Sequence, residues 1–379
     1  MSTRDPKPPT KLVHGGRRKE WRRGLVNPPV ERASTILFDS AAELRGNKPG
    51  LGVYRYGLQG TATHWALSDA LTQLEPGAAG TALYSSGLAA ITATLLTLLS
   101  PGDELLATDC VYGPTRKFCD TILKRHGVTT RYYDPLEIPE FGERTRAIML
   151  ESPGSQTMEV QDVPGISAIA REHGVATVLD NTWATPLFFQ AIAAGVDVSI
   201  LAATKYVGGH ADLLLGATTA TEEYFSRIQT ASWDMGHAVS ADDAFLASRG
   251  LRTMAVRLEQ HEKGALRVAR WLQKQPQVGR VLHPALPNCP GHELWKRDFT
   301  GSSGLFSFEL RSGDRGKFVE ALELFGIGYS WGGYESLAIP VDPIRTVSRP
   351  PAPNLVRLHV GLEDPDDLIE DLAQSFAKL

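Results

Sequence analysis

The sequence has few cysteines and no pattern that would pair them. Cys110, Cys119 and Cys289 are isolated residues in a chain of 379, and none forms a CxxC motif. The ten histidines form no HExxH motif, so we expect no zinc site and no disulfide framework. An odd, low number of cysteines suits a reducing compartment, which predicts a cytoplasmic protein.

Long apolar runs and an excess of positive charge are also missing. The longest apolar candidate, AAITATLLTLLSPGD, is stopped by Pro101 and Gly102 before it could span a bilayer. The 39 Lys and Arg residues against 43 Asp and Glu give a formal net charge of -4. We therefore expect neither a membrane nor a nucleic acid as a partner.

The beginning of the chain lacks the apolar core of a secretion signal. Its basic sequence, MSTRDPKPPTKLVHGGRRKEWRRG, would allow a transit peptide, but the prolines oppose an amphipathic helix. We favour a mobile arm for this stretch. Residues 1–59 as a whole contain many turn formers and few periodic segments, which predicts an N-terminal arm rather than a domain.

The remainder of the chain has an ordinary globular composition, with 42% hydrophobic and 22% charged residues. Its length exceeds what one core usually holds, so more than one domain is expected. Residues 60–249 alternate β-branched apolar runs with helical segments, which predicts an α/β domain with a mostly parallel sheet between helices. Continuous apolar runs indicate strands buried on both faces. The expected strands are GTALYSS, DELLATD, VTTRYYD, TRAIMLES, VATVLDN and VDVSILAATK.

Helices are expected between these strands and in a second, smaller α+β domain over residues 250–379. In the first domain they cover HWALSDALTQLE, GLAAITATLLTLL, GPTRKFCDTILKRHG, GISAIAREHG and FFQAIAAG. A long helical stretch then begins near Ser240, which has Asp243 at the spacing of a capping box. The C-terminal strands are GLFSFEL and NLVRLHVGL, and the helices are GKFVEALELFG and DPDDLIEDLAQSFAKL.

Three features that could carry chemistry follow expected strands. A helix begins at Gly87 after two serines, and the free N–H groups of a helix N-terminus can bind an anion. Asp180 ends one strand, and Lys205 follows the next. Each has an ordinary alternative: a turn without a ligand, an aspartate that caps its own turn through Thr182, and a solvated loop lysine.

Together the three features indicate one ligand, because ligands of open α/β sheets bind at the carboxyl ends of the strands. Pyridoxal phosphate needs an anion site for its phosphate, an acid for its pyridine nitrogen and a lysine for its aldehyde carbon. Thr204 could add a hydroxyl to the phosphate site. Tyr112 could stack on the ring, although a core or turn tyrosine is the alternative.

Several longer segments resemble the Cys/Met-metabolism family of pyridoxal-phosphate enzymes, which has the aspartate-aminotransferase fold. The resemblance runs from about residue 11 to the C-terminus and rests on LDNTWATP, AATKYVGGHAD, SRGLRT, KRDFTGSSGLFSF, YSWGGYESL and RLHVGLED. It implies a large domain with a seven-stranded sheet between helices, and a homotetramer built from two dimers. The segments ESPGSQTMEV and YSWGGYESL are similar to the bacterial cystathionine β-lyase branch.

The resemblance implies roles for individual residues around the cofactor. Lys205 resembles the lysine that bonds covalently to the cofactor, Asp180 the partner of the pyridine nitrogen, and Tyr112 the tyrosine that stacks on the ring. These three form the implied catalytic set. The implied phosphate donors are Gly87, Leu88 and Thr204.

The resemblance also implies substrate contacts. Arg357 resembles the arginine that holds the substrate α-carboxylate, a grip that suits its forked donors. Ser330 and Trp331 resemble residues of the substrate pocket. Tyr56 resembles a tyrosine that reaches the active site of a neighbouring subunit and contacts both cofactor and substrate there, and it places the arm against that subunit.

One departure from the family pattern follows Tyr56. Leu58 and Gln59 stand where better-known β-lyases have two arginines, the first of which grips the cofactor phosphate from the partner subunit. We hypothesise that Arg55 replaces part of this charge.

The implied reaction is β-elimination, the cleavage of L-cystathionine to homocysteine, pyruvate and ammonia in methionine biosynthesis, with cysteine and its S-conjugates as further substrates. A γ-acting relative on the same cofactor is the nearest alternative, and a non-catalytic ligand-binding protein on this fold is another. A dinucleotide-dependent dehydrogenase is disfavoured, because the sequence lacks the glycine fingerprint GxGxxG.

Overall fold

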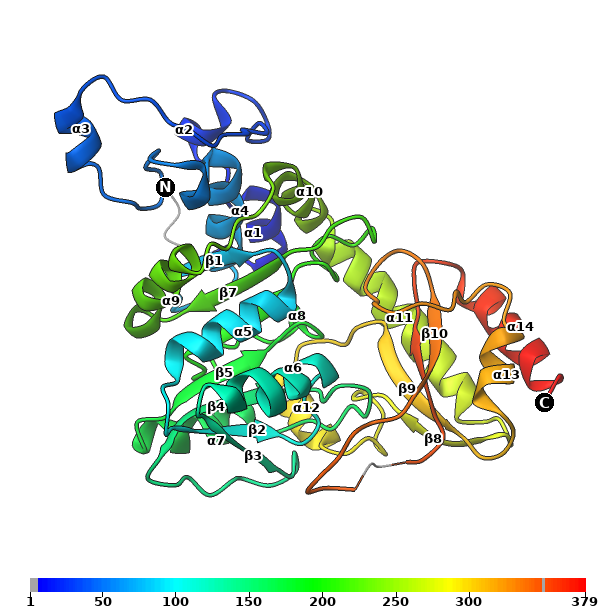
Figure 1. The fold of residues 1–379 in the computed structure, drawn as a ribbon. Helices are drawn as coiled ribbons and strands as arrows, with labels where there is room; N and C mark the ends of the chain where they lie inside the picture. The colour runs from blue at the N-terminus through cyan, green and yellow to red at the C-terminus, as the bar shows by residue number, and fades with distance from the viewer. Residues whose placement is uncertain (1–5, 350–351) are drawn as a thin grey trace.

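The computed structural model describes residues 6–349 and 352–379. Two sheets dominate the fold (Figure 1), a seven-stranded sheet and a four-stranded sheet. The seven-stranded sheet has the order β1-β7-β6-β5-β4-β2-β3. Its strands are β1 (Gly80–Tyr84), β2 (Glu104–Thr108), β3 (Thr129–Tyr133), β4 (Thr145–Glu151), β5 (Ala176–Asp180), β6 (Val198–Ala202) and β7 (Gly216–Ala220).

The mostly parallel sheet of the sequence prediction is confirmed. Strands β2 to β6 pair in parallel, whereas β7 lies antiparallel between β1 and β6. The sequence prediction missed β7 because GATTA has small side chains and no strong apolar run. Alternate residues of β4 enter two separate cores, Ile148 on one face and Met149 on the other, so the strand is buried on both faces.

Helices cover both faces of this sheet. They are α4 (Ala62–Thr72), α5 (Gly87–Leu98), α6 (Gly113–Phe118) with a π-helical continuation (Cys119–Leu123), α7 (Val163–Glu172), α8 (Thr185–Phe188) and α9 (Glu222–Asp234). The helix expected over FFQAIAAG is wrong. Helix α8 ends at Phe188, and turns follow, because the carbonyl of Phe189 accepts a hydrogen bond from Asn181 Nδ2 instead of continuing the helix.

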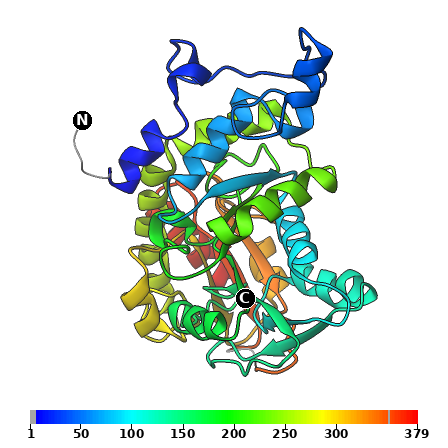
Figure 2. The same ribbon diagram turned by 90° about the vertical axis from the view of Figure 1, so that its left-hand side faces the viewer.

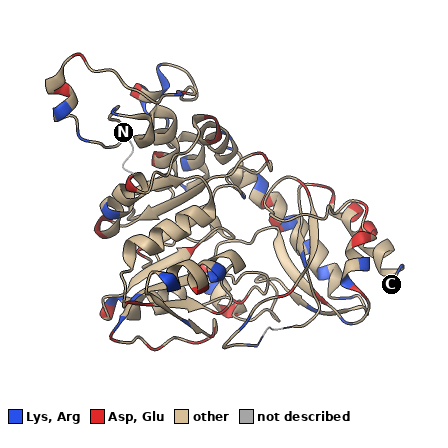
Figure 3. Ribbon diagram, viewed as in Figure 1, with Lys and Arg blue, Asp and Glu red and all other residues tan. Residues whose placement is uncertain are grey.

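The second sheet has the order β10-β11-β9-β8 and is antiparallel throughout. Its strands are β8 (Val278–Leu282), β9 (Leu305–Leu310), β10 (Leu337–Val341) and β11 (Leu355–His359). The helices of this part of the chain are α10 (Ala241–Leu251), α11 (Met254–Leu272), α12 (His292–Asp298), α13 (Arg315–Glu320) and α14 (Pro365–Phe376). Ser240 caps α10, but its hydroxyl accepts from the N–H of Asp242 rather than Asp243, so the predicted capping box is wrong. Residues of both signs of charge are scattered along the chain, mainly on helices and loops (Figure 3).

The N-terminal segment is partly docked on the rest of the chain. Helix α1 (Pro8–His14) buries Leu12, and Arg252 Nη1 donates to the carbonyl of Leu12 at 2.7 Å. The expectation of a mobile start is therefore wrong from residue 8 onward, because prolines in the first helical turn are compatible with a helix. The prediction for residues 1–5 lies outside the described residues. Farther along, α2 (Lys19–Arg22) packs on α4 through Trp21, which contacts Trp65, whereas α3 (Ala41–Gly46) buries no residue and lies away from the main body (Figure 2).

Two buried carboxylates, Asp109 and Glu159, tie the loop between β10 and β11 to the part of the chain that forms the seven-stranded sheet. Asp109, which follows β2, pairs with Arg116 at 2.6 Å and accepts hydrogen bonds from the N–H groups of Thr346, Val347 and Ser348. Arg345 pairs with Glu159 at 2.7 Å, and their side chains are 3% and 4% exposed. We call these two pairs and residues 345–348 the clasp. It holds the two sheets together alongside the apolar core that side chains of both sheets share.

Burial acts to raise the pKa of Asp109, but the bonds it accepts from Ser348, Val347, Thr346 and Arg116 lower that pKa well below its ordinary value. The carboxylate therefore stays charged inside the protein. The clasp is an ionic joint rather than an apolar one.

Candidate active site

Asp180 and Lys205 lie at the same edge of the seven-stranded sheet. Asp180 is the last residue of β5 and pairs in register with Ile200 of β6. Lys205 follows β6 in a turn, where its N–H donates to the carbonyl of Ala202 at 3.0 Å. The carboxyl ends of two neighbouring parallel strands thus bring an acid and an amine together, as the sequence predicts.

The carboxylate of Asp180 is oriented by Thr182. Its Oδ1 accepts from the N–H of Thr182 at 3.0 Å and from the hydroxyl at 2.5 Å, so the capping role considered from the sequence is also present. Desolvation raises the pKa of Asp180, while the Thr182 bonds and the charge of Lys205 oppose that rise. Asp180 keeps part of its surface accessible. A carboxylate that has lost most of its hydration but can still be reached by a ligand is stabilised when a cationic ligand binds beside it.

Lys205 is not a solvated loop lysine. Its Nζ lies 2.5 Å from Ser330 Oγ and 5.2 Å from the ring centroid of Trp331. Desolvation lowers the pKa of Lys205 to about 8, the charge of Arg357 adds to the effect, and Asp180 opposes it. An amine that titrates near neutral pH can act as a nucleophile and as a base.

The predicted anion site lies beside these two residues. Helix α5 begins at Gly87, and Ser86 caps it by accepting from the N–H of Ala89 at 3.1 Å. A Cβ on Gly87 would lie 2.6 Å from the Cβ of Ala202. Only glycine allows the helix to begin so close to Ala202, the last residue of β6, which precedes Lys205 by three residues.

Thr204 contacts Leu215, the residue before β7. Its hydroxyl accepts from the N–H of Leu215 at 3.0 Å and donates to the carbonyl of Leu215 at 3.3 Å. A bond from Thr204 to a phosphate would replace the longer of these two contacts. Its role as a phosphate donor stays a prediction.

The opposite wall of the site comes from the four-stranded sheet and the loop before β10. Arg357 of β11 donates through Nη2 to the carbonyl of Ser330 at 2.9 Å, and desolvation lowers its pKa to about 10. Ser330 has a φ of 84° and Gly332 a φ of 85°. A Cβ on Gly332 would lie 3.1 Å from the Cα of Lys205. The loop is therefore pressed against the lysine that it faces.

Tyr112 and an acid that the sequence prediction missed complete the site. The N–H of Tyr112 donates to Glu151 Oε2 at 2.6 Å. Glu151 ends β4 and pairs in register with Asp180. Desolvation, followed by the charge of Asp180, raises the pKa of Glu151 well above its ordinary value. The signal that found Asp180, an acid at the end of an apolar strand, could have found Glu151 as well.

Tyr112 itself is close to the charges of the site. Desolvation raises its pKa, Glu151 and Asp180 raise it further, and Arg357 opposes the rise. Tyr112 is 43% exposed, so it is accessible to a ligand. The structure therefore brings Tyr112, Asp180, Lys205 and Arg357 together.

Tyr56 and its neighbours lie apart from this group. Tyr56 is half-exposed on the N-terminal arm, where it forms a β-bridge with Thr35. Arg55 is exposed, and Leu58 and Gln59 lie in a short 3₁₀ helix. The predicted roles of Tyr56 and Arg55 depend on a second subunit and stay predictions.

The donor set fits pyridoxal phosphate. The N-terminus of α5 suits a phosphate, the desolvated Asp180 suits a pyridinium, and Lys205 has the lowered pKa that covalent attachment of an aldehyde requires. Across residues 6–349 and 352–379, no cluster of three His, Cys, Asp or Glu residues has metal-binding geometry. In the same part of the chain, no helix is long and apolar enough to cross a membrane.

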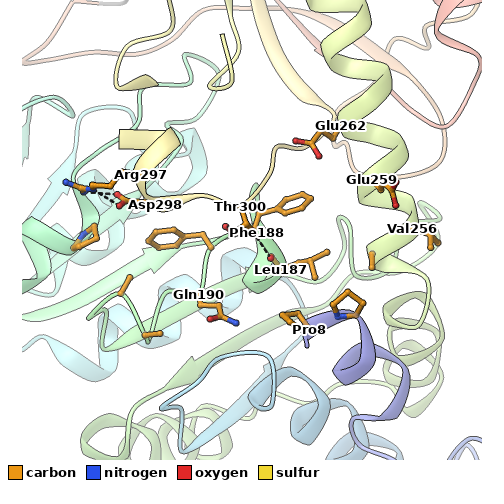
Figure 4. A pocket seen from close by; sticks show the side chains of 16 residues that line it. Pro8, Leu187, Phe188, Gln190, Val256, Glu259, Glu262, Arg297, Asp298 and Thr300 are labelled. Atoms are coloured by element: carbon orange, nitrogen blue, oxygen red, sulfur yellow. Dashed lines mark hydrogen bonds and ion pairs between the residues drawn. The ribbon is translucent and has the colours of Figure 1, made fainter. Parts of the chain in front are cut away.

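A separate groove of about 950 Å³ opens between α1, α8 and α11 (Figure 4). It is lined mainly by apolar side chains, among them Pro8, Leu187, Phe188 and Val256, with Glu259, Glu262 and Arg297 around them. None of the predicted site residues lines it. The groove is therefore not the chemical site.

Comparisons with known proteins agree with this donor set. A family model described as Cys/Met metabolism PLP-dependent enzyme matches residues 9–377. The cystathionine β-lyase MetC of Escherichia coli K12 is 44% identical over 99% of both chains, and the cystathionine β-lyase of Salmonella typhimurium is 44% identical over 98% of both. The crystal structure of apo CalE6, a methionine γ-lyase from Micromonospora echinospora, superposes with a TM-score of 0.87 at 32% identity, over 98% of this chain and 99% of that one.

Proposed function

The chain belongs to the Cys/Met metabolism family of PLP-dependent enzymes, and on that premise we propose that it is a carbon–sulfur β-lyase of the cystathionine β-lyase type. With water, it would convert L-cystathionine to homocysteine, pyruvate and ammonia. Two relatives of that name, each 44% identical over nearly the whole chain, support the substrate. The observation that carries the chemistry is the amine of Lys205, which has a lowered pKa and faces Asp180 and Arg357.

Lys205, Asp180 and the N-terminus of α5 would hold the cofactor. When bound, pyridoxal phosphate supplies an electron sink for the bond electrons released at the substrate α-carbon. Asp180 would keep a proton on the pyridine nitrogen, because a desolvated carboxylate favours a cation beside it. Tyr112, with its partly exposed phenol, would pack against the ring.

Substrate binding would fall to Arg357. Its guanidinium donates only to the carbonyl of Ser330 among the contacts described for it, so further N–H groups can bind a carboxylate in a two-point grip. This grip would orient the α-carbon toward Lys205, which is a positioning effect. Lys205 Nζ would then remove the α-proton as the general base. Breaking the bond between the β-carbon and sulfur releases the thiol.

The decisive experiment is identification of the keto acid formed from cystathionine. β-Cleavage gives pyruvate, whereas γ-cleavage gives 2-oxobutyrate, and the methionine γ-lyase with the same fold makes that alternative specific. Lys205→Ala should remove both turnover and the visible absorbance of the lysine-bound cofactor, whereas the exposed Lys263→Ala should keep both. A purified protein that stays colourless with added cofactor would favour a non-catalytic binding protein.

We also propose a homotetramer built from two dimers, a cytoplasmic location, and an arm over residues 1–59 that reaches a neighbouring subunit. The arm exposes apolar side chains, including Leu37 at 90% and Leu51 at 53%, and such surface usually has a partner. Tyr56 and Arg55 would enter the neighbour's site from this arm. The division into a cofactor domain (60–249) and a C-terminal domain (250–379) is part of the same proposal.

A further inference from the structure

His359 is a buried histidine behind the substrate wall, and the chemistry described above does not use it. It is the last residue of β11, two residues after Arg357, and has no exposed surface. Both of its ring nitrogens contact the main chain of one loop, residues 330–335. Nε2 lies 3.0 Å from the nitrogen of Gly332, and Nδ1 lies 3.0 Å from the carbonyl oxygen of Glu335.

These two partners determine the protonation state of the ring. A backbone N–H can only donate and a backbone carbonyl can only accept. The assigned form is therefore neutral, with a proton on Nδ1 that is donated to Glu335 and a lone pair on Nε2 that accepts from Gly332. A proton on Nε2 would face the N–H of Gly332 and break that bond.

The surroundings favour the same neutral form. The ring of His261, on α11, lies 5.1 Å from that of His359, and the ring of Tyr206 lies 6.0 Å away. Burial, followed by the charges of His261, Arg357 and Lys205, lowers the pKa of His359 well below its ordinary value, although its bond to Glu335 opposes the effect. The ring thus adds no positive charge behind Lys205.

The loop that His359 holds has a costly backbone. Ser330, a residue with a Cβ, has a φ of 84°, a left-handed backbone conformation that is unfavourable for such a residue. The loop is nevertheless held where Ser330 Oγ meets Lys205 Nζ at 2.5 Å. External ties must offset this cost, and His359 supplies two of them next to the bond from Arg357 to the carbonyl of Ser330.

We propose that His359 is a positioning residue whose neutral ring ties residues 330–335 to β11, so that Ser330 meets Lys205 and Arg357 stands ready for the substrate carboxylate. The catalytic consequence rests on the proposed function. The tie itself is a property of the fold and can be measured without the reaction.

Two near-isosteric variants separate the two bonds. His359→Asn keeps a donor at the position of Nδ1 and loses the acceptor for Gly332, whereas His359→Gln keeps an acceptor at the position of Nε2 and loses the donor to Glu335. The matched control is His261→Asn, because His261 is equally buried but bonds through Nδ1 to the carbonyl of Val360, outside the loop. The wild-type protein and the three variants, each with cofactor bound, are compared by amide hydrogen exchange and by steady-state kinetics.

We expect exchange of residues 330–335 to rise about fivefold in both His359 variants, as the loss of one hydrogen bond worth about 1 kcal/mol implies. At Gly332 the rise should appear in His359→Asn and be smaller in His359→Gln. KM for the amino-acid substrate should rise by more than kcat falls, since Arg357 and Ser330 lose their alignment. His261→Asn should leave exchange in the loop and KM unchanged.

Unchanged exchange in both His359 variants overturns the inference, and so does an equal rise in His261→Asn, which would indicate general loosening. The wild-type protein could form no pyruvate while amide exchange in the loop still rises only in the His359 variants. That result would contradict the proposed function and support the tie. The two failures are therefore distinguishable.

Discussion

The two walls of the active site are held in place by different means. Asp180 and Lys205 stand at the ends of neighbouring strands, where a backbone ladder fixes their separation. Ser330 and Trp331 stand on a loop with two left-handed residues, and side chains of β11 hold that loop. The first wall is rigid because of its topology, whereas the second depends on a few specific contacts.

This difference predicts different consequences of substitution. Changes on the sheet wall should affect chemistry while leaving the fold intact, because the ladder does not need the side chains. Changes on the loop wall should weaken substrate binding and increase the mobility of residues 330–335. Five predictions follow from the comparison, beginning with the contact that joins the walls.

Separating the walls should have the largest effect. Asp109→Ala leaves Arg116 buried without its partner and removes the acceptor of three loop N–H groups, so we expect a loss of about 3–5 kcal/mol in unfolding free energy. Urea denaturation measures it. Glu259→Ala, which breaks an exposed pair with Lys263, is the control and should leave the unfolding free energy nearly unchanged. Equal losses in the two variants would contradict the clasp.

Removing the acid of the sheet wall should be nearly as severe for the reaction. In Asp180→Ala we expect kcat to fall by roughly 100-fold, because a charge-assisted hydrogen bond of about 3 kcal/mol is lost. The unfolding free energy of the cofactor-free protein should not fall by more than about 1 kcal/mol, since the desolvated carboxylate is itself unfavourable. A large loss of stability with normal kcat would reverse this interpretation.

Changing the arginine of the loop wall should affect binding more than chemistry. Arg357→Lys keeps the charge but loses the two-point grip and the bond to Ser330, so KM should rise by about 10- to 30-fold. Steady-state kinetics with cystathionine test this. If KM stayed constant while kcat fell, Arg357 would not be the carboxylate ligand.

A smaller effect is expected at the anion site. Gly87→Ala places a Cβ against Ala202, and relieving the clash should cost about 1–3 kcal/mol. Because the helix start moves, cofactor affinity should fall, which absorbance titration of the cofactor-free protein can follow. Gly46→Ala, where nothing lies within 4 Å of the new Cβ, should leave affinity unchanged.

The last effect is small at pH 7 and grows only in acid, and it concerns the contribution of His283 to stability. Burial lowers the pKa of His283, at the end of β8, to about 3, below the 6.5 of an unfolded histidine. Below about pH 6.5 the unfolded chain therefore binds a proton on His283 that the folded chain does not. The free energy of unfolding falls as pH drops from about 6.5 toward 3, by up to about 1.4 kcal/mol per pH unit.

A variant must separate the effect of His283 on acid stability from the effects of other titrating groups. Burial raises the pKa of Glu75 to about 7, so Glu75 changes stability in the opposite direction between pH 4.5 and 7. His283→Asn keeps an acceptor for the N–H of Ala285, which His283 Nδ1 contacts at 3.1 Å. Urea denaturation at pH 5 and 7 should show a flatter acid-side slope for this variant. Identical slopes would contradict the prediction.

The sequence predicted the sheet wall far better than the loop wall. Alternating strands and helices place Asp180 and Lys205 at one edge without any long-range information. Local patterns do not show that Gly332 presses on Lys205, nor that Asp109 meets residues 346–348, because these contacts join segments more than 100 residues apart. Ser330, Trp331 and Arg357 were found through family resemblance, and His359 was found only in the structure.

The clasp also limits how the two halves of the molecule can move. It fixes the β10–β11 loop at two points, one at Asp109 and one at Glu159. Ile339, Val341 and Leu355 of the four-stranded sheet also enter the same apolar core as Ile148 of β4, so ionic and apolar contacts together oppose a change in the angle between the two sheets. Because Tyr112 follows Asp109 by three residues, the carboxylate that anchors the loop also stands next to the residue proposed to pack on the cofactor ring.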